Sequence, residues 1–277
     1  LLAKDRRVIA VDLSGHGAST RLVGSYSLRS NADRIFALMD RMDIERAHVL
    51  GFSYGGGVAM TMADMAPDRL ASLTLLGSIG IQEGEGTGDY AFEHLKYRVG
   101  YIMLVGVVEA IPHFGLLGDR TIRHGFLRSF MDLDQRPLRK ILDELETPTL
   151  ILHGSDDVLV APWVAVEHHR LVEPSRLVLL EGSHFMIFID DGPQLLAEHM
   201  RPFLARHDEP GVAVERAMLD LTVDEEAAEL PSELSIERGS NPWLQMTIIA
   251  LATLVSEDLT CVAAGLLASR GQLDIFV

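Results

Sequence analysis

Short apolar runs alternate with helical patterns along the first two thirds of the chain. Residues 27–42, and the segment after residue 53 with Val58, Met62 and Met65 at spacings near 3.6, predict helices. Strands that alternate with helices predict an α/β fold, a doubly wound and mostly parallel sheet with helices on both faces. In such sheets ligands lie beyond the carboxyl ends of the strands. The predicted strands are RVIAVDL (7–13), AHVLGF (47–52), LASLTLLG (70–77), TPTLILHG (147–154) and SRLVLLEG (175–182).

The second of these strands leads into a glycine cluster that surrounds one serine, Ser53. The chain must turn sharply there, and Gly51, Gly55 and Gly56 suit a close approach of strand and helix. The spacing matches G-x-S-x-G, in which the serine hydroxyl stands clear of the sheet and the next amide, that of Tyr54, faces a developing oxyanion. The alternative is a glycine-rich turn that holds an incidental serine. The motif alone does not separate the two interpretations.

Two later strands end in residues that could activate a serine. Asp156 and Asp157 follow the fourth predicted strand, and His184 follows the fifth. A serine hydroxyl needs an imidazole to take its proton, and the imidazole needs a carboxylate to fix its tautomer. The order serine, acid, histidine is the order found in elbow enzymes.

Charge and cysteine content exclude several classes of protein. Forty acidic residues against 24 basic ones give a net charge of −16, which excludes nucleic acid as a partner. Cys261 is the only cysteine, so the chain has no intrachain disulfide and fits a reducing compartment. His168 and His169 are adjacent and lack the i, i+4 spacing of a helical metal pair. We expect neither a metal nor another cofactor.

Two regions interrupt the alternation of strands and helices. Residues 80–143 are rich in large apolar side chains and predict a helical cap inserted over the active edge, or else additional helical packing. Residues 207–241 are acidic and poor in aromatic residues, and we expect a solvated linker there.

Four motifs in order resemble those of the α/β-hydrolase fold superfamily, over about residues 1–206. VDLSGHGAST resembles the segment after the fourth strand of that fold, GFSYGG its elbow, HGSDDVLVAP its acid loop and GSHF its histidine loop. The resemblance implies a serine hydrolase acting on a small-molecule ester or related acyl bond through Ser53, His184 and Asp157, with Asp156 as the alternative acid. It gives His16 a loop-ordering role. His153 precedes the acid loop, and we expect it to pack at the strand end.

The second oxyanion donor of that family lies in a loop after its third strand, upstream of the first residue here. The resemblance therefore implies an incomplete hydrolase fold, with Tyr54 as the one identifiable donor and an exposed sheet edge. Acyl transfer, perhydrolysis and carbon–carbon bond hydrolysis use the same triad and stay open.

The last segment, residues 242–277, is apolar. Between Trp243 and Ser269 it is long enough to cross a bilayer, but Glu257 and Asp258 interrupt it. A membrane segment whose acids face protein or water, a re-entrant piece and a packed hydrophobic helix are the alternatives. ALATLVSEDLTCVAAGLLASRG resembles the start of the DedA-type (SNARE-associated) membrane proteins, which implies Glu257 as an embedded acid.

Together these features predict a membrane-associated protein with its hydrolase domain on the cytoplasmic side. Membrane lipid is then a partner through the apolar segment, and a lipophilic acyl substrate would suit the apolar cap. The competing hypothesis is a non-catalytic hydrolase-like domain attached to a membrane transport protein. The sequence leaves the oligomeric state open.

Overall fold

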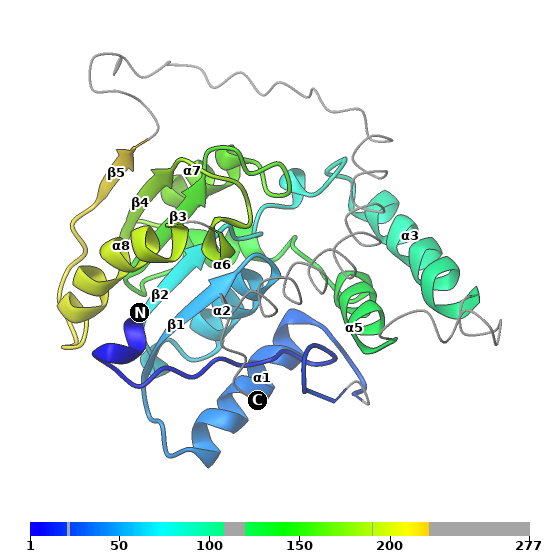
Figure 1. Ribbon diagram of the computed structural model, residues 1–277, viewed down its shortest axis with the longest axis horizontal. Coiled ribbons are helices and arrows are strands. Elements are labelled where there is room, and N and C mark those ends of the chain that lie inside the picture. Colours follow the sequence, from blue (N-terminus) through cyan, green and yellow to red (C-terminus); the bar gives the residue numbers. More distant parts are fainter. Residues whose placement is uncertain (21–22, 108–119, 190, 222–277) are drawn as a thin grey trace, which may run out of the picture.

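A five-stranded parallel sheet organises the protein (Figure 1). The computed structural model describes residues 1–20, 23–107, 120–189 and 191–221. The strands lie in the order in which they occur along the chain, and each pairs with the next in parallel. All their carboxyl ends therefore share one edge of the sheet. The strands are β1 (Ala47–Phe52), β2 (Leu70–Leu76), β3 (Thr149–Gly154), β4 (Ser175–Leu180) and β5 (Ala217–Asp220).

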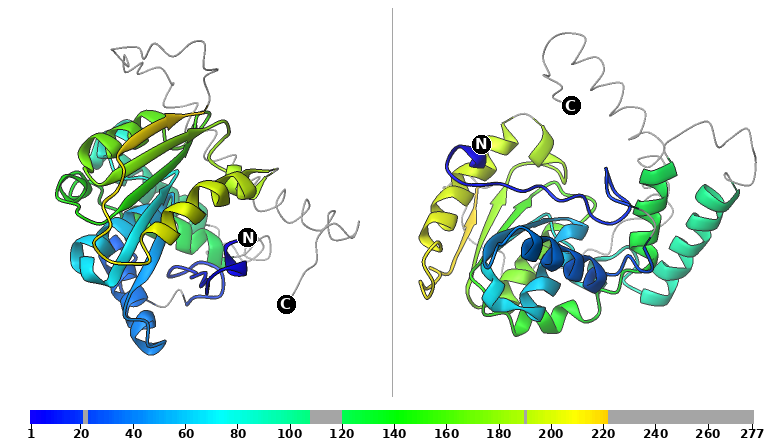
Figure 2. Two further views of the ribbon diagram at one scale, coloured as in Figure 1. Left: turned by 90° about the vertical axis from the view of Figure 1, so that its left-hand side faces the viewer. Right: turned by 90° about the horizontal axis from the view of Figure 1, so that it is seen from below.

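Helices cover both faces of the sheet, as the alternating pattern predicts (Figure 2). One face packs on α1 (Leu28–Arg41), α2 (Tyr54–Met65), α6 (Leu138–Asp143) and α7 (Pro162–Leu171). The other face packs on α8 (Gly192–Arg206). Further helices, α3 (Tyr90–Tyr101), the π-helix η4 (Ile102–Val107) and α5 (Arg120–Met131), lie beside this core.

The central strands divide their side chains between two apolar clusters. Leu75 of β2 and Ile151 of β3 pack with α2, whereas Leu76 and Leu152 point the other way and pack with α8. Every residue of β2 and of β3 is buried. Strands buried on both faces read as continuous apolar runs, which explains why these two were recognisable in the sequence.

The predicted strand at residues 7–13 is wrong. The segment runs as non-helical chain with no sheet pairing, and Val8, Ile9 and Val11 are exposed. A strand needs a partner for its backbone hydrogen bonds, and in the part of the chain that the structure describes β1 is the edge strand, paired only with β2. Apolar content alone indicated burial here, but no neighbouring strand provides it.

The sheet extends beyond residue 206 into the region expected to be a linker. There β5 pairs with β4, with Ala217 opposite Arg176 and Asp220 opposite Leu179. The strand is short and half exposed, so its apolar signal is weak. Residues 222–241, the apolar segment 242–277 and Glu257 lie outside the described residues. Across the described ranges, no helix has both the length and the apolar character needed to cross a membrane.

The insertion at residues 80–143 contains α3, η4, α5 and α6, joined by turns where the structure describes it. It is anchored to the loop after β2, because the Gln135 side-chain oxygen accepts the Gly80 amide at 2.9 Å. It also contacts the first residue of α2, since the rings of Tyr54 and Phe130 lie 6.2 Å apart. The insertion therefore contacts α2 next to the turn that holds Ser53.

Candidate active site

Ser53 occupies a strained turn between β1 and α2. Its φ of 51° and ψ of −120° place a non-glycine residue in a sparsely populated region. Its amide donates to the Leu76 carbonyl at 3.0 Å, which ties the turn to β2. The strained serine at the carboxyl end of a parallel strand matches the geometry that the glycine cluster predicts.

The glycines around Ser53 differ in what they contribute. A Cβ on Gly51 would collide with the backbone of Gly55 and Gly56, and a Cβ on Gly56 would collide with the Ser78 side chain. A Cβ on Gly55 would meet nothing within 4 Å, so the expected steric need for glycine at that position is wrong. Gly51 and Gly56 alone allow the close approach of strand and helix.

Asp157 is buried and fully hydrogen-bonded. One carboxylate oxygen accepts the amides of Leu159 and Val160, at 2.9 and 2.8 Å. The other accepts from Nδ1 of His184 at 2.6 Å. The neighbouring Asp156 is exposed. Of the two candidate acids, the structure brings only Asp157 to the histidine.

His184 lies against the strand that carries the turn. Its ring is 4.9 Å from the ring of Phe52, the residue before Ser53, and 5.4 Å from that of Phe185, to which it is perpendicular. Nδ1 is engaged with Asp157, so in the neutral imidazole Nε2 is the nitrogen free to accept a proton. The contacts described for His184 do not include a hydrogen bond to the Ser53 hydroxyl.

Gly77 lies directly against the His184–Asp157 pair. It follows β2 with a φ of 48°, and a Cβ there would lie 3.3 Å from His184 Nδ1 and 3.4 Å from Asp157 Oδ2. Gly77 is not among the site residues that the sequence predicts. A glycine directly after a fully apolar run was the available signal.

Tyr54 is held by its side chain as well as by α2. Its hydroxyl donates to the Tyr26 carbonyl at 2.5 Å, and the Asn31 amide lies 3.5 Å from that hydroxyl. Burial raises the pKa of the Tyr54 phenol, so the hydroxyl keeps the proton that it donates. The backbone of Tyr54 is held by α2, and its hydroxyl is held by Tyr26 and Asn31. The direction of its backbone amide is therefore fixed.

Three other histidines take no part in the hydrogen bond between His184 and Asp157. His153 is buried and donates from Nε2 to the Val160 carbonyl at 2.8 Å, which is the strand-end packing expected of it; burial lowers its pKa. His168 is also buried, and its two ring nitrogens have no hydrogen-bond partner among the described residues. Burial lowers the pKa of His168 to about 3. His16 contacts the Ser14 carbonyl at 3.1 Å within its own turn, in line with a loop-ordering role.

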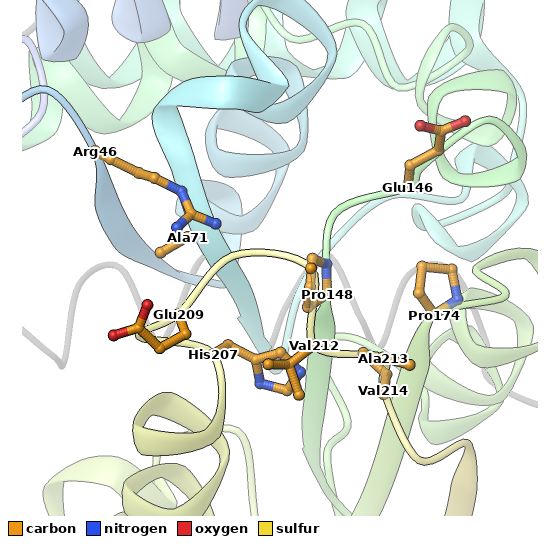
Figure 3. A pocket seen from close by; sticks show the side chains of 11 residues that line it. Arg46, Ala71, Glu146, Pro148, Pro174, His207, Glu209, Val212, Ala213 and Val214 are labelled. Carbon is orange, nitrogen blue, oxygen red and sulfur yellow. The ribbon is translucent and has the colours of Figure 1, made fainter.

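A cavity of about 260 Å³ lies away from these residues, at the amino ends of the strands (Figure 3). It is lined by residues that directly precede strands, such as Arg46 before β1, Pro148 before β3 and Pro174 before β4, and by His207 after α8. A parallel sheet presents its functional loops at the other edge. We therefore place the candidate active site at Ser53, Asp157 and His184, and not in this cavity.

Comparison with known proteins agrees with the fold. The profile of the alpha/beta hydrolase fold family matches residues 1–99. Pimeloyl-[acyl-carrier protein] methyl ester esterase of Neisseria meningitidis is 30% identical over 204 residues, which cover 66% of this chain and 76% of the esterase. A hydrolase structure from Pseudomonas aeruginosa aligns with a TM-score of 0.53 and 26% identity over 70% of this chain and 77% of that one. The chain belongs to the α/β-hydrolase fold family.

One further relative is matched over only part of its own length. The dihydrolipoyllysine-residue acetyltransferase component of the acetoin cleaving system of Pseudomonas putida is 30% identical over 233 residues, 74% of this chain. The chain spans 58% of that protein. Nothing in these matches extends the family assignment to a membrane domain.

Proposed function

We propose that the protein is a serine hydrolase that cleaves an ester or related acyl bond, with Ser53 as nucleophile, His184 as general base and Asp157 as the orienting carboxylate. One observation carries the proposal: the 2.6 Å hydrogen bond between His184 and a fully bonded Asp157, on an imidazole packed against Phe52 beside the strained Ser53. A buried carboxylate that holds a histidine in one tautomer is what the reaction needs.

The reaction has two steps. His184 Nε2 takes the Ser53 proton as the serine oxygen attacks the acyl carbon, and the imidazolium then donates that proton to the departing alcohol oxygen, which leaves an acyl-serine. Water loses a proton to Nε2 as it attacks the acyl-serine, and the proton returns to Ser53 as the acid is released. The Tyr54 amide would stabilise the oxyanion in both steps, and its doubly anchored residue suits that task.

The direct test is covalent labelling of the full chain with a fluorophosphonate, which reacts with an activated serine. We expect mass spectrometry to place the label on Ser53 and Ser53→Ala to abolish it. Ser183→Ala is the matched control, because it removes a hydroxyl from the histidine loop and should leave labelling intact. A folded protein that takes up no label would favour the alternative, a hydrolase-like domain without catalysis.

The substrate side of the proposal is a lipophilic acyl compound met at a membrane. Residues 80–143 would form the apolar cap of one hydrolase domain that spans residues 1–206 and is completed by β5, and residues 242–277 would hold it at the bilayer, with Glu257 as an embedded acid. The esterase relative supports ester chemistry only.

Comparison of short and long acyl esters, with and without vesicles, tests this substrate class. A preference for short soluble esters in every condition would contradict it and leave the triad proposal intact.

A further inference from the structure

His153 lies directly beside the candidate catalytic carboxylate, although the proposed reaction gives it no part. It is the last residue but one of β3, and its Nε2 lies 3.4 Å from Oδ2 of Asp157. That oxygen is the one that accepts the hydrogen bond from His184. The side chains of His153 and Asp157 are 1% and 0% exposed. One buried carboxylate oxygen therefore faces two imidazoles, which come from two neighbouring strand ends.

A second connection joins His153 to Asp157 through Val160. Nε2 of His153 donates to the Val160 carbonyl at 2.8 Å, and the Val160 amide donates to Oδ1 of Asp157 at 2.8 Å. Val160 ends the loop that carries Asp157, so the bond from His153 fastens that end of the loop to β3. The direction of an amide that fixes the carboxylate therefore depends on His153.

The Val160 carbonyl also sets the tautomer of His153. A carbonyl oxygen can only accept, so the hydrogen is on Nε2, and in the neutral ring the lone pair is on Nδ1. Burial lowers the pKa of His153, which keeps the ring neutral. A neutral neighbour leaves the charge of Asp157 available to the imidazolium that forms on His184, whereas a second cation would compete for it.

We propose that His153 is a positioning residue, which holds Asp157 in the orientation in which that carboxylate accepts from Nδ1 of His184. The catalytic consequence rests on the proposed function, whereas the effect on the hydrogen bond between His184 and Asp157 does not. The alternative role is packing at the strand end. The two roles have different requirements, because positioning needs an N–H donor at Nε2 and packing needs only a side chain of suitable volume.

Substitutions of His153 in the full chain separate these roles. His153→Leu fills the buried space without a donor, while His153→Gln retains an N–H donor at a similar distance from the backbone. His153→Asn is polar but shorter, so its amide falls short of Val160, and it replaces the leucine variant if that variant fails to fold. The matched control is His168→Leu, because His168 is also buried and its ring nitrogens bond to none of the described residues.

The first measurement is the proton NMR spectrum, in which a short hydrogen bond from histidine to carboxylate gives a separate low-field resonance. Its loss in Asp157→Asn assigns it to His184. We expect His153→Leu to shift or lose this resonance, and His153→Gln and His168→Leu to retain it. The second measurement is hydrolysis of p-nitrophenyl acetate. There we expect His153→Leu to lower kcat roughly tenfold to a hundredfold with KM within about twofold, and His153→Gln to restore kcat to within about threefold.

Three results would overturn the proposal. One is an unchanged resonance and an unchanged kcat in a folded His153→Leu or His153→Asn variant. Another is an equal loss in His153→Gln and His153→Leu, which would show that the donor has no role. The third is an equal loss in His168→Leu, which would show a general response to replacing a buried histidine. An original chain that has the resonance but hydrolyses no ester would instead count against Ser53 as nucleophile, and the NMR comparison would still decide the role of His153.

Discussion

The two edges of the sheet differ in backbone conformation and in hydrogen bonding. At the carboxyl edge Ser53 and Gly77 have positive φ values, and Asp157 is surrounded by donors. At the amino edge the strands are entered through residues such as Pro148 and Pro174, and the 260 Å³ cavity lies there. The 260 Å³ cavity lies at the amino edge, while the strained and fully hydrogen-bonded residues of the candidate site lie at the carboxyl edge. We chose the carboxyl edge because strain and a buried, hydrogen-bonded carboxylate indicate a functional site, and the predictions below test that choice.

The largest expected effect is at the carboxyl edge, for Asp157→Asn. The asparagine oxygen can still accept the two loop amides, but its NH₂ group would face Nδ1 of His184 and impose the wrong tautomer. We expect kcat/KM for an activated ester to fall about 10⁴-fold with little change in the free energy of unfolding. Asp156→Asn, at the exposed neighbour, should change activity less than twofold. Equal losses in the two variants would contradict the assignment.

A second prediction concerns buried charge near this edge, where His168 lies against Gly80. The native state holds His168 neutral to about pH 3, whereas the unfolded chain takes up a proton near pH 6.5. Stability is therefore lost as pH falls through this window, by at most about 1.4 kcal/mol per pH unit. His168→Leu should flatten the pH dependence of the free energy of unfolding, measured by urea denaturation. His199→Leu, at a half-buried histidine whose pKa is also lowered, should flatten it less.

A smaller effect is expected for Gly77→Ala. An L-residue at a φ of 48° is strained, and its Cβ would crowd the His184–Asp157 pair. We expect a loss of about 1–2 kcal/mol in the free energy of unfolding. The matched control is Gly55→Ala, where the added Cβ meets open space within a helix and should be neutral or stabilising by about 0.5–1 kcal/mol. If both variants lose the same stability, backbone strain does not distinguish Gly77.

The smallest effect is expected at the amino edge. Val212→Trp would place a large side chain in the cavity, far from the carboxyl ends of the strands. We expect esterase activity to stay within twofold of the original protein. A large loss of activity in a folded Val212→Trp variant would show that the two edges are coupled. It would contradict the assignment of the candidate site to the carboxyl edge alone.

The sequence predicts those parts of the fold that depend on the spacing of nearby residues. Strands β1 to β4, the glycine turn at Ser53 and the choice of Asp157 over Asp156 depend on short-range spacing. The failures depend on long-range partners. Residues 7–13 are apolar enough for a strand but have no neighbour to pair with, and β5 has a weak pattern but finds β4. Gly77 and Phe52 escaped notice because their importance comes from a histidine more than a hundred residues away.

The parallel pairing of β5 fixes the edge of the sheet at which residue 221 lies. Because β5 runs in the same direction as β4, residue 221 leaves the sheet on the side where Ser53, Asp157 and His184 lie. The last described residue therefore lies toward the edge that holds the candidate site, and not toward the amino edge with its cavity.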